Sequence, residues 1–196
     1  MKYCPNVRQI IDVMYAKNYR VFKNVRGYDL NIIGIRSNDT TSNSFNDWLS
    51  IFYNYDNRFV QFNFPCTTDP GTFYRNNPLN DKGTAVIVPN QFRSLWKTGK
   101  HRNYEALVQK NEIKVYRDNN KDDKLDFENI ESGFFGINLH RAHKEFILND
   151  VNKFSAGCQV VQDPLHFDFI MLLCSKAKEL YGDGFTYTLL EENDFN

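Results

Sequence analysis

The sequence predicts a β-dominated α+β fold with a helical segment at the N-terminus. The chain has 196 residues, which is about the size of one domain. Short apolar runs separated by turn residues recur through its middle, and this pattern is typical of strands. Apolar residues with helical spacing occur near both ends, at residues 6–18 and 164–180.

Residues 1–46 are predicted to form an N-terminal segment of helix, strand and linker. An amphipathic helix is expected over residues 6–18, where the apolar residues are Val7, Ile10, Ile11 and Met14. A strand over residues 30–35 and a polar loop or linker over 37–47 follow. The larger domain is then expected to span residues 47–196.

Most of the predicted strands lie in this larger domain. Asp56 and Asn57 interrupt the β-rich stretch 48–64 and tolerate a tight turn, so a β-hairpin is predicted. Asp69-Pro70-Gly71 marks the next turn. The remaining short elements are predicted as strands at 84–88, 113–116, 134–139 and 185–190, and as a short helix at 102–110.

The clearest helix is predicted to begin at Pro164. Asp163 is a good N-cap, and proline is favoured at the first helical position. Gly182 or Gly184 is expected to end this helix. Its apolar face is expected to comprise Leu165, Phe169, Leu172, Leu173 and Leu180.

The composition argues against several classes of function. Lys plus Arg number 24, as do Asp plus Glu, so no bulk positive field exists and no nucleic-acid partner is predicted. The longest apolar run, 169–174, is far shorter than the roughly 18 residues of a membrane span. The first residues lack the apolar run of a signal peptide, so synthesis in the cytoplasm with free thiols is expected. The 24 Asn residues indicate AT-rich codons and are compatible with a bacteriophage source.

Cys158 and His140 are the strongest candidates for chemistry. A cysteine nucleophile reacts as the thiolate and needs a base or a cation nearby. His140 ends a predicted strand, and Gly157 lets the backbone turn closely enough to aim N–H groups at an oxyanion. On their 18-residue spacing alone, a buried filler cysteine and a structural histidine are the favoured alternative.

These residues resemble the L,D-transpeptidase catalytic-domain family. GINLH at 136–140 is similar to that family's strand-ending histidine, and Ser155-Ala156-Gly157-Cys158 is similar to its Ser-x-Gly-Cys motif. The hairpin at 48–64 and TTDPGTFY at 67–74 resemble its paired strands and loop. The resemblance covers roughly residues 48–175. It implies an L,D-transpeptidase-like β-sandwich with flanking helices.

The resemblance implies acyl transfer on peptidoglycan stem peptides through a thioester. It implies Cys158 as the nucleophile, His140 as the base, and N–H groups near Gly157 and Cys158 as donors to the oxyanion. Ser155 is expected to orient His140 or the loop, with a plain turn hydroxyl as an equal alternative. No cofactor is required. A lytic or wall-editing peptidase, such as a phage endolysin released to the cell wall, is expected rather than a cross-linking enzyme.

Three other basic positions are candidates for binding or catalysis. Arg141 follows His140 directly, and a guanidinium can bind a carboxylate through two hydrogen bonds, so Arg141 is predicted to hold a substrate carboxylate. His143 is the rival base, although a solvated loop position is the preferred interpretation. His101 lies in the basic segment 97–102, for which a solvated face is preferred over contact with an anion.

One acidic loop carries oxygen side chains at alternate positions. Asp118, Asn120, Asp122 and Asp126 match positions 1, 3, 5 and 9 of a calcium loop, and Ca²⁺ prefers six to eight oxygen ligands. The pattern lacks the central glycine and the final bidentate glutamate. The acidic residues therefore indicate either a structural calcium site or a solvated turn between two strands.

Two further functions stay open. Ala156 and Val160 stand where the family usually has His and either Arg or Asn, so the same fold could serve as a non-catalytic cell-wall-binding or phage structural module. A cysteine peptidase or acyltransferase with another substrate is the third interpretation. An activated Cys158 is expected to be alkylated faster than Cys174, which is predicted to be buried, and this separates enzyme from module.

Overall fold

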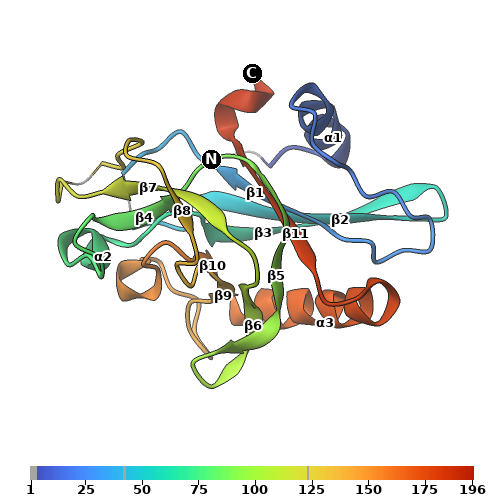
Figure 1. Cartoon of the computed structure of the whole chain (residues 1–196). Coiled ribbons are helices and arrows are strands. Elements are labelled where there is room, and N and C mark those ends of the chain that lie inside the picture. Colours follow the sequence, from blue (N-terminus) through green and yellow to red (C-terminus); the bar gives the residue numbers. More distant parts are fainter. Residues whose placement is uncertain (1–3, 42, 123) are drawn as a thin grey trace.

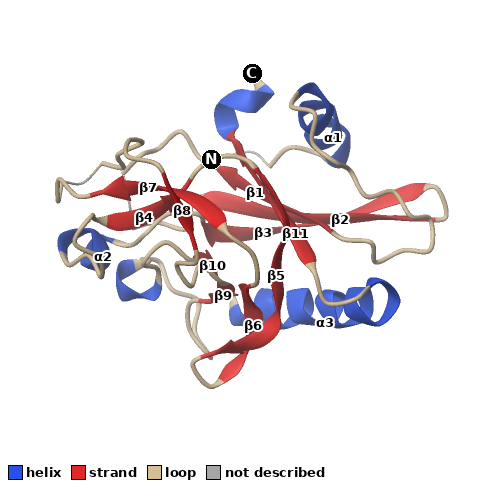
Figure 2. Ribbon diagram, viewed as in Figure 1, coloured by secondary structure: helices blue, strands red, loops and turns tan. Residues whose placement is uncertain are grey.

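A computed structural model describes residues 4–41, 43–122 and 124–196 of the chain. Figure 1 and Figure 2 show many strands and few helices, which confirms the predicted β-dominated α+β class. The elements are, in chain order, α1 (Val7–Ala16), β1 (Asn31–Arg36), β2 (Asp47–Tyr55), β3 (Arg58–Thr67), α2 (Thr72–Asn76), β4 (Thr84–Ile87), β5 (Gln91–His101), β6 (Tyr104–Gln109), β7 (Ile113–Asp118), β8 (Glu131–Gly133), β9 (Leu139–Arg141), η1 (Asn152–Phe154), β10 (Gln159–Val161), α3 (Pro164–Tyr181), β11 (Phe185–Glu191) and η2 (Glu192–Phe195).

The strands form two sheets. Eight of them close into a barrel in the order β1-β11-β5-β6-β9-β10-β3-β2, and β4, β7 and β8 form a second sheet at its left in Figure 1. β1 runs parallel to β11 and β9 parallel to β10, whereas the other pairs are antiparallel. The predicted β2–β3 hairpin is confirmed. Its turn residues Asp56 and Asn57 have φ of 48° and 61°, as in a type I′ turn, whose twist matches that of the strands.

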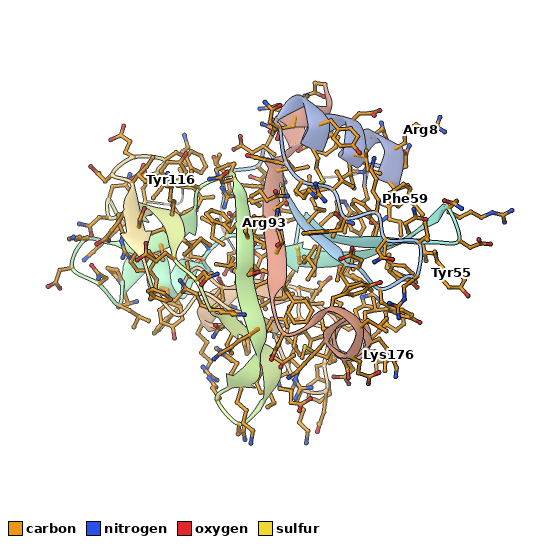
Figure 3. The ribbon with its side chains drawn as sticks, turned by 45° about the vertical axis from the view of Figure 1, so that its right-hand side comes forward. Arg8, Tyr55, Phe59, Arg93, Tyr116 and Lys176 are labelled. Carbon is orange, nitrogen blue, oxygen red and sulfur yellow. The ribbon has the colours of Figure 1, made fainter. Side chains whose placement is uncertain are left out.

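Helix α1 confirms the predicted N-terminal helix and packs on the outside of the barrel. The Asn6 side chain accepts the N–H groups of Arg8 and Gln9, and the Gln9 side chain accepts the Asn6 N–H, which closes a capping box. α1 and α3 cover opposite sides of the barrel (Figure 2). Figure 3 shows Arg8, Tyr55 and Lys176 pointing outward from α1, the end of β2 and α3. No helix among the described residues is long and apolar enough to cross a membrane.

No domain boundary separates residues 46 and 47. β1 lies between β2 and β11, so it is one of the barrel strands. Ile32 faces the barrel core, while Ile33 and Ile35 pack with Ile10 and Met14 of α1 on the outer face. The predicted division into 1–46 and 47–196 is therefore wrong, because β1 is needed to close the barrel and α1 packs on that same strand.

Helix α3 begins where it was predicted but buries a different face. The Asp163 side chain accepts the Leu165 N–H at 2.8 Å, and the helix ends at Gly182. Leu165 and Leu172 are 74% and 56% exposed, which contradicts the predicted face. Apolar residues occur on several sides of α3, and contact with the barrel decides which ones are buried. The residues that face the core are Phe167, Ile170, Leu173, Cys174 and Ala177.

The hairpin β5–β6 replaces a predicted helix. Residues 104–109 form β6, and β5 pairs with it from Trp96 opposite Gln109 to His101 opposite Tyr104. Consecutive residues 106 and 107 are both fully buried, so β6 lacks the alternation of a strand with one exposed face. The pairing with β5 decides its conformation. Of the predicted strand at 134–139, only residue 139 lies in a strand.

Candidate active site

Pairing of two short parallel strands brings Cys158 and His140 to one place. Val160 of β10 pairs with His140 of β9, so Cys158, two residues before Val160, lies beside Asn138. The Asn138 backbone N–H donates to Cys158 Sγ at 3.4 Å. Cys158 and His140 both line one cavity of about 430 Å³. The register of β9 and β10 thus closes the 18-residue separation in the sequence.

The Ser155 hydroxyl holds the turn that presents the cysteine. It donates to the Cys158 carbonyl at 2.8 Å and accepts the Gly157 N–H at 3.2 Å. Gly157 has φ of +117°, and a Cβ there would lie 2.6 Å from the Ala85 carbonyl oxygen, so only glycine fits. Ser155 therefore orients the loop and not His140. The Gly157 N–H was expected to donate to an oxyanion, but it already donates to the Ser155 hydroxyl. The Cys158 N–H has no partner among the described residues.

The loop over residues 67–74 is hydrogen-bonded to the 155–158 turn and to the residue that follows it. The Gly71 N–H donates to the Ser155 carbonyl at 2.9 Å. The Gln159 side chain donates to the Thr68 carbonyl at 3.2 Å. The backbone is thus held on both sides of the cysteine, which limits the movement of its thiol.

The ring of His140 is buried and its tautomer is set by its neighbours. Nδ1 lies 2.9 Å from the Arg141 carbonyl oxygen, which only accepts, so the proton is on Nδ1 and Nε2 is the acceptor. The Tyr104 hydroxyl lies 3.3 Å from Nδ1 and from the same carbonyl. Burial, and then the nearby His101, lower the pKa of His140 to about 3. The imidazole is therefore neutral at pH 7, with Nε2 ready to accept a proton.

The Cys158 thiol is also neutral at pH 7. Burial raises its pKa to about 11, against the smaller opposite effect of the Asn138 N–H. The thiol donates to the Gly136 carbonyl at 3.7 Å, and no hydrogen bond joins it to His140 in the described structure. The site therefore holds no preformed thiolate–imidazolium pair. A nucleophilic role for Cys158 would require that the thiol proton first passes to a base.

Residues for which the sequence favoured a solvated face also line this cavity. His101 stacks on His140, with ring centroids 4.0 Å apart and planes 8° apart. Arg102 and Lys153 are exposed, line the cavity and make no ion pair within the described residues. One sequence signal could have indicated that His101 lies at a hairpin turn. Asn103 is a residue type common in turns, and it lies in the turn between β5 and β6. The apolar part of the wall consists of Leu79, Phe134, Phe135 and Phe154.

Arg141 and His143 lie outside the cavity. The Arg141 guanidinium lies over the Tyr104 ring at 4.5 Å and 3.4 Å from Asp168, where it lines a separate pocket. Arg141 therefore does not line the cavity that holds Cys158, because successive residues of a strand point to opposite faces. His143 Nδ1 accepts two backbone N–H groups at 3.1 Å within its own loop.

The predicted calcium ligands do not fit a calcium ion. Asp118 is fully buried, and its carboxylate lies 3.0 Å from the Arg75 guanidinium. Asp122 lies 3.5 Å from the same guanidinium and also bonds Asn120. A buried cation of the protein thus supplies the positive charge that the acidic residues need. The described part of the chain contains no cluster of three or more acidic, His or Cys residues that could hold a metal ion. Asp126, the fourth predicted ligand, therefore belongs to no such cluster either.

Comparisons of the chain with protein-family models, with curated proteins and with solved structures find no match.

Proposed function

We propose that this protein is a cysteine-dependent peptidase or transpeptidase that acts on peptidoglycan stem peptides through a thioester. The observation that carries the proposal is the common cavity into which paired strands bring Cys158 and His140. The resemblance of the 155–158 motif and of His140 to L,D-transpeptidase domains supports the substrate class. The Asn-rich composition supports a bacteriophage source, and with it a lytic or wall-editing role at the cell wall.

The geometry supports a general-base route for acylation. Nε2 of His140 takes the thiol proton while Cys158 Sγ attacks the peptide carbonyl carbon. The Cys158 N–H, which has no partner among the described residues, donates to the resulting oxyanion. Collapse breaks the C–N bond, and His140 gives its proton to the leaving amine. An amine or a water then attacks the thioester, passes its proton to His140 and releases the thiol.

The charges at the cavity favour a substrate with carboxylates. Arg102 and Lys153 have no acidic partner within the described residues, so their positive charges are available to a ligand. Arg117 also lines the cavity, but Glu131 neutralises it at 2.7 Å. Peptidoglycan stem peptides carry free carboxylates. Arg102 and Lys153 therefore take the role that the sequence assigned to Arg141.

Mass spectrometry of purified peptidoglycan after incubation with the protein tests this function. Cys158→Ala is expected to abolish product formation, because a methyl group cannot form the thioester. His140→Ala is expected to lower turnover by roughly 10²–10⁴-fold, the usual cost of losing a general base. His143→Ala is the matched control and is expected to act like the wild type. Product formation by a folded Cys158→Ala protein would refute the proposal.

One observation favours a second candidate, a non-catalytic cell-wall-binding module on the same fold. Burial raises the Cys158 pKa to about 11, and the thiol makes no hydrogen bond with His140 in the described structure. Iodoacetamide alkylation at pH 7 separates the two functions. The enzyme requires that Cys158 reacts faster than in the His140→Ala variant, because His140 removes the thiol proton. Equal rates, with peptidoglycan bound but unchanged, support the binding module.

A further inference from the structure

Two histidines from different parts of the barrel are stacked in the candidate active site. His101 ends β5, and His140 lies in β9. Their rings are nearly parallel, 8° apart, with centroids separated by 4.0 Å. Both residues line the cavity that contains Cys158. His101 therefore lies close enough to the reacting groups to touch a bound substrate.

Asn138 determines the tautomer of His101. The Asn138 Oδ1 accepts the Gln109 backbone N–H at 3.0 Å, which fixes the orientation of the amide. Its Nδ2 consequently faces His101 Nδ1 at 3.1 Å and donates to it. The His101 proton is then on Nε2, which makes no hydrogen bond within the described residues.

The two stacked rings thus have opposite tautomers. His140 carries its proton on Nδ1 and offers Nε2 as an acceptor, whereas His101 offers Nε2–H as a donor. Burial, and then the neighbouring Arg102, lower the pKa of His101, so its ring is neutral at pH 7. Two imidazolium ions at this distance would repel each other strongly. When His140 receives the thiol proton, His101 therefore stays a neutral donor.

We propose that His101 is a second catalytic residue, whose Nε2–H donates a hydrogen bond to the oxyanion formed when Cys158 attacks a carbonyl. This inference rests on the proposed acyl-transfer function. The proton balance needs no further reactant, because the thiol proton moves to His140 and then to the leaving group, and His101 keeps its own proton throughout. The Cys158 N–H is the second donor to the same oxygen, in place of the engaged Gly157 N–H.

The test compares a reaction that forms an oxyanion with one that does not. Acylation of Cys158 by p-nitrophenyl acetate and by a stem peptide passes through an oxyanion, whereas alkylation by iodoacetamide does not. His101→Phe keeps a stacked ring without the N–H and is expected to lower both acylation rates by roughly 10²–10³-fold. Its alkylation rate is expected to stay within about threefold of the wild type, because His140 is still present to take the thiol proton.

Two smaller variants control for folding and for the position of the donor. His101→Gln places an amide N–H near the position of Nε2, so acylation is expected to recover to within about tenfold of the wild type. His101→Asn places its amide near Nδ1 and is expected to be as slow as His101→Phe. Melting temperatures of all three variants verify that they are folded.

The outcomes separate this inference from the proposed function. If His101→Phe lowers alkylation as much as acylation, or leaves both unchanged, His101 is not an oxyanion donor. Acylation by p-nitrophenyl acetate with the expected variant ranking, but without reaction of the stem peptide, keeps the inference and overturns only the proposed substrate. If neither p-nitrophenyl acetate nor the stem peptide acylates the wild-type protein, both the inference and the proposed function are overturned.

Discussion

Asn138 connects the components of the candidate active site through three hydrogen bonds. Its backbone N–H donates to Cys158 Sγ, its amide nitrogen donates to His101, and its amide oxygen accepts the Gln109 N–H. One residue just before β9 thus orients the Cys158 thiol and the stacked His101 ring together. The thiol and His140 are both neutral in this environment, so the proposed reaction requires transfer of the thiol proton and does not start from a stable ion pair.

The buried neutral state of His140 predicts a pH-dependent stability. Its pKa is about 3 in the folded protein and about 6.5 in the unfolded chain. Between these values only the unfolded state binds the proton, so stability is lost as the pH falls, by up to roughly 1.4 kcal/mol per pH unit. Urea denaturation from pH 7 to pH 4.5 is expected to show a smaller loss for His140→Phe than for the wild type, by about 2 kcal/mol. Parallel curves for the two proteins would contradict this prediction.

Among the elements, α3 shows how tertiary contacts select one face of a helix. Leu172 and Leu173 are neighbours in the sequence and chemically identical, yet Leu172 is exposed and Leu173 packs in the core. Phe169 lies on the same exposed side of α3 as Leu172. Its ring packs edge to face against Phe62 of β3, with the ring centroids 5.0 Å apart. Helical periodicity alone is ambiguous here because apolar residues are spread around the helix.

The two leucines form a matched pair of variants. Leu173→Ala is expected to lower the free energy of unfolding by about 2–5 kcal/mol, because it removes buried methyl groups and leaves a cavity. Leu172→Ala is expected to change it by less than about 0.5 kcal/mol, since the side chain is already largely in water. Chemical denaturation of both variants measures the difference. Equal losses would contradict the burial of Leu173 alone, and a larger loss for Leu172→Ala would mean that α3 packs on its other face.

At the scale of the whole molecule, the N-terminal strand β1 closes the same barrel that carries His140 of the candidate site. β1 pairs with β2 on one side and with β11 on the other. The cavity draws its wall from both sheets, since Ala85 of β4 and Arg117 of β7 line it together with His140 of the barrel. The site therefore depends on the integrity of both sheets and not on the Cys158 motif alone.

A truncated chain of residues 47–196 is expected not to fold. Removal of β1 opens the barrel and leaves the edges of β2 and β11 unpaired. A chain of residues 19–196 keeps all the strands and loses the segment that contains α1. It is expected to fold with lower stability, because the outer apolar cluster around Ile33 becomes exposed. Circular dichroism during thermal melting compares the two chains. Cooperative melting of 47–196 would restore a domain boundary at residue 46.

Several features follow from the sequence alone because their causes are local. Asp163 and Pro164 set the start of α3, and Asp56-Asn57 sets the β2–β3 turn, because caps and turns depend on hydrogen bonds and dihedral angles within a few residues. The same holds for the 155–158 turn, in which Ser155 and Gly157 serve the backbone geometry around Cys158. The motif also predicts Cys158 as a nucleophile and His140 as its base, and these roles stay predictions. The structure places both residues on one cavity.

Other features depend on contacts between distant residues, and only the tertiary structure decides them. The register of β9 and β10, together with the β5–β6 hairpin, stacks His101 on His140, although the sequence favours a solvated His101. Asp118 was expected to be a calcium ligand, but in the structure it is buried and forms an ion pair with Arg75. The physical reason is the same in each case. Burial, pKa and ion pairing depend on which surfaces meet, and the pattern of one segment does not contain the surface of its partner.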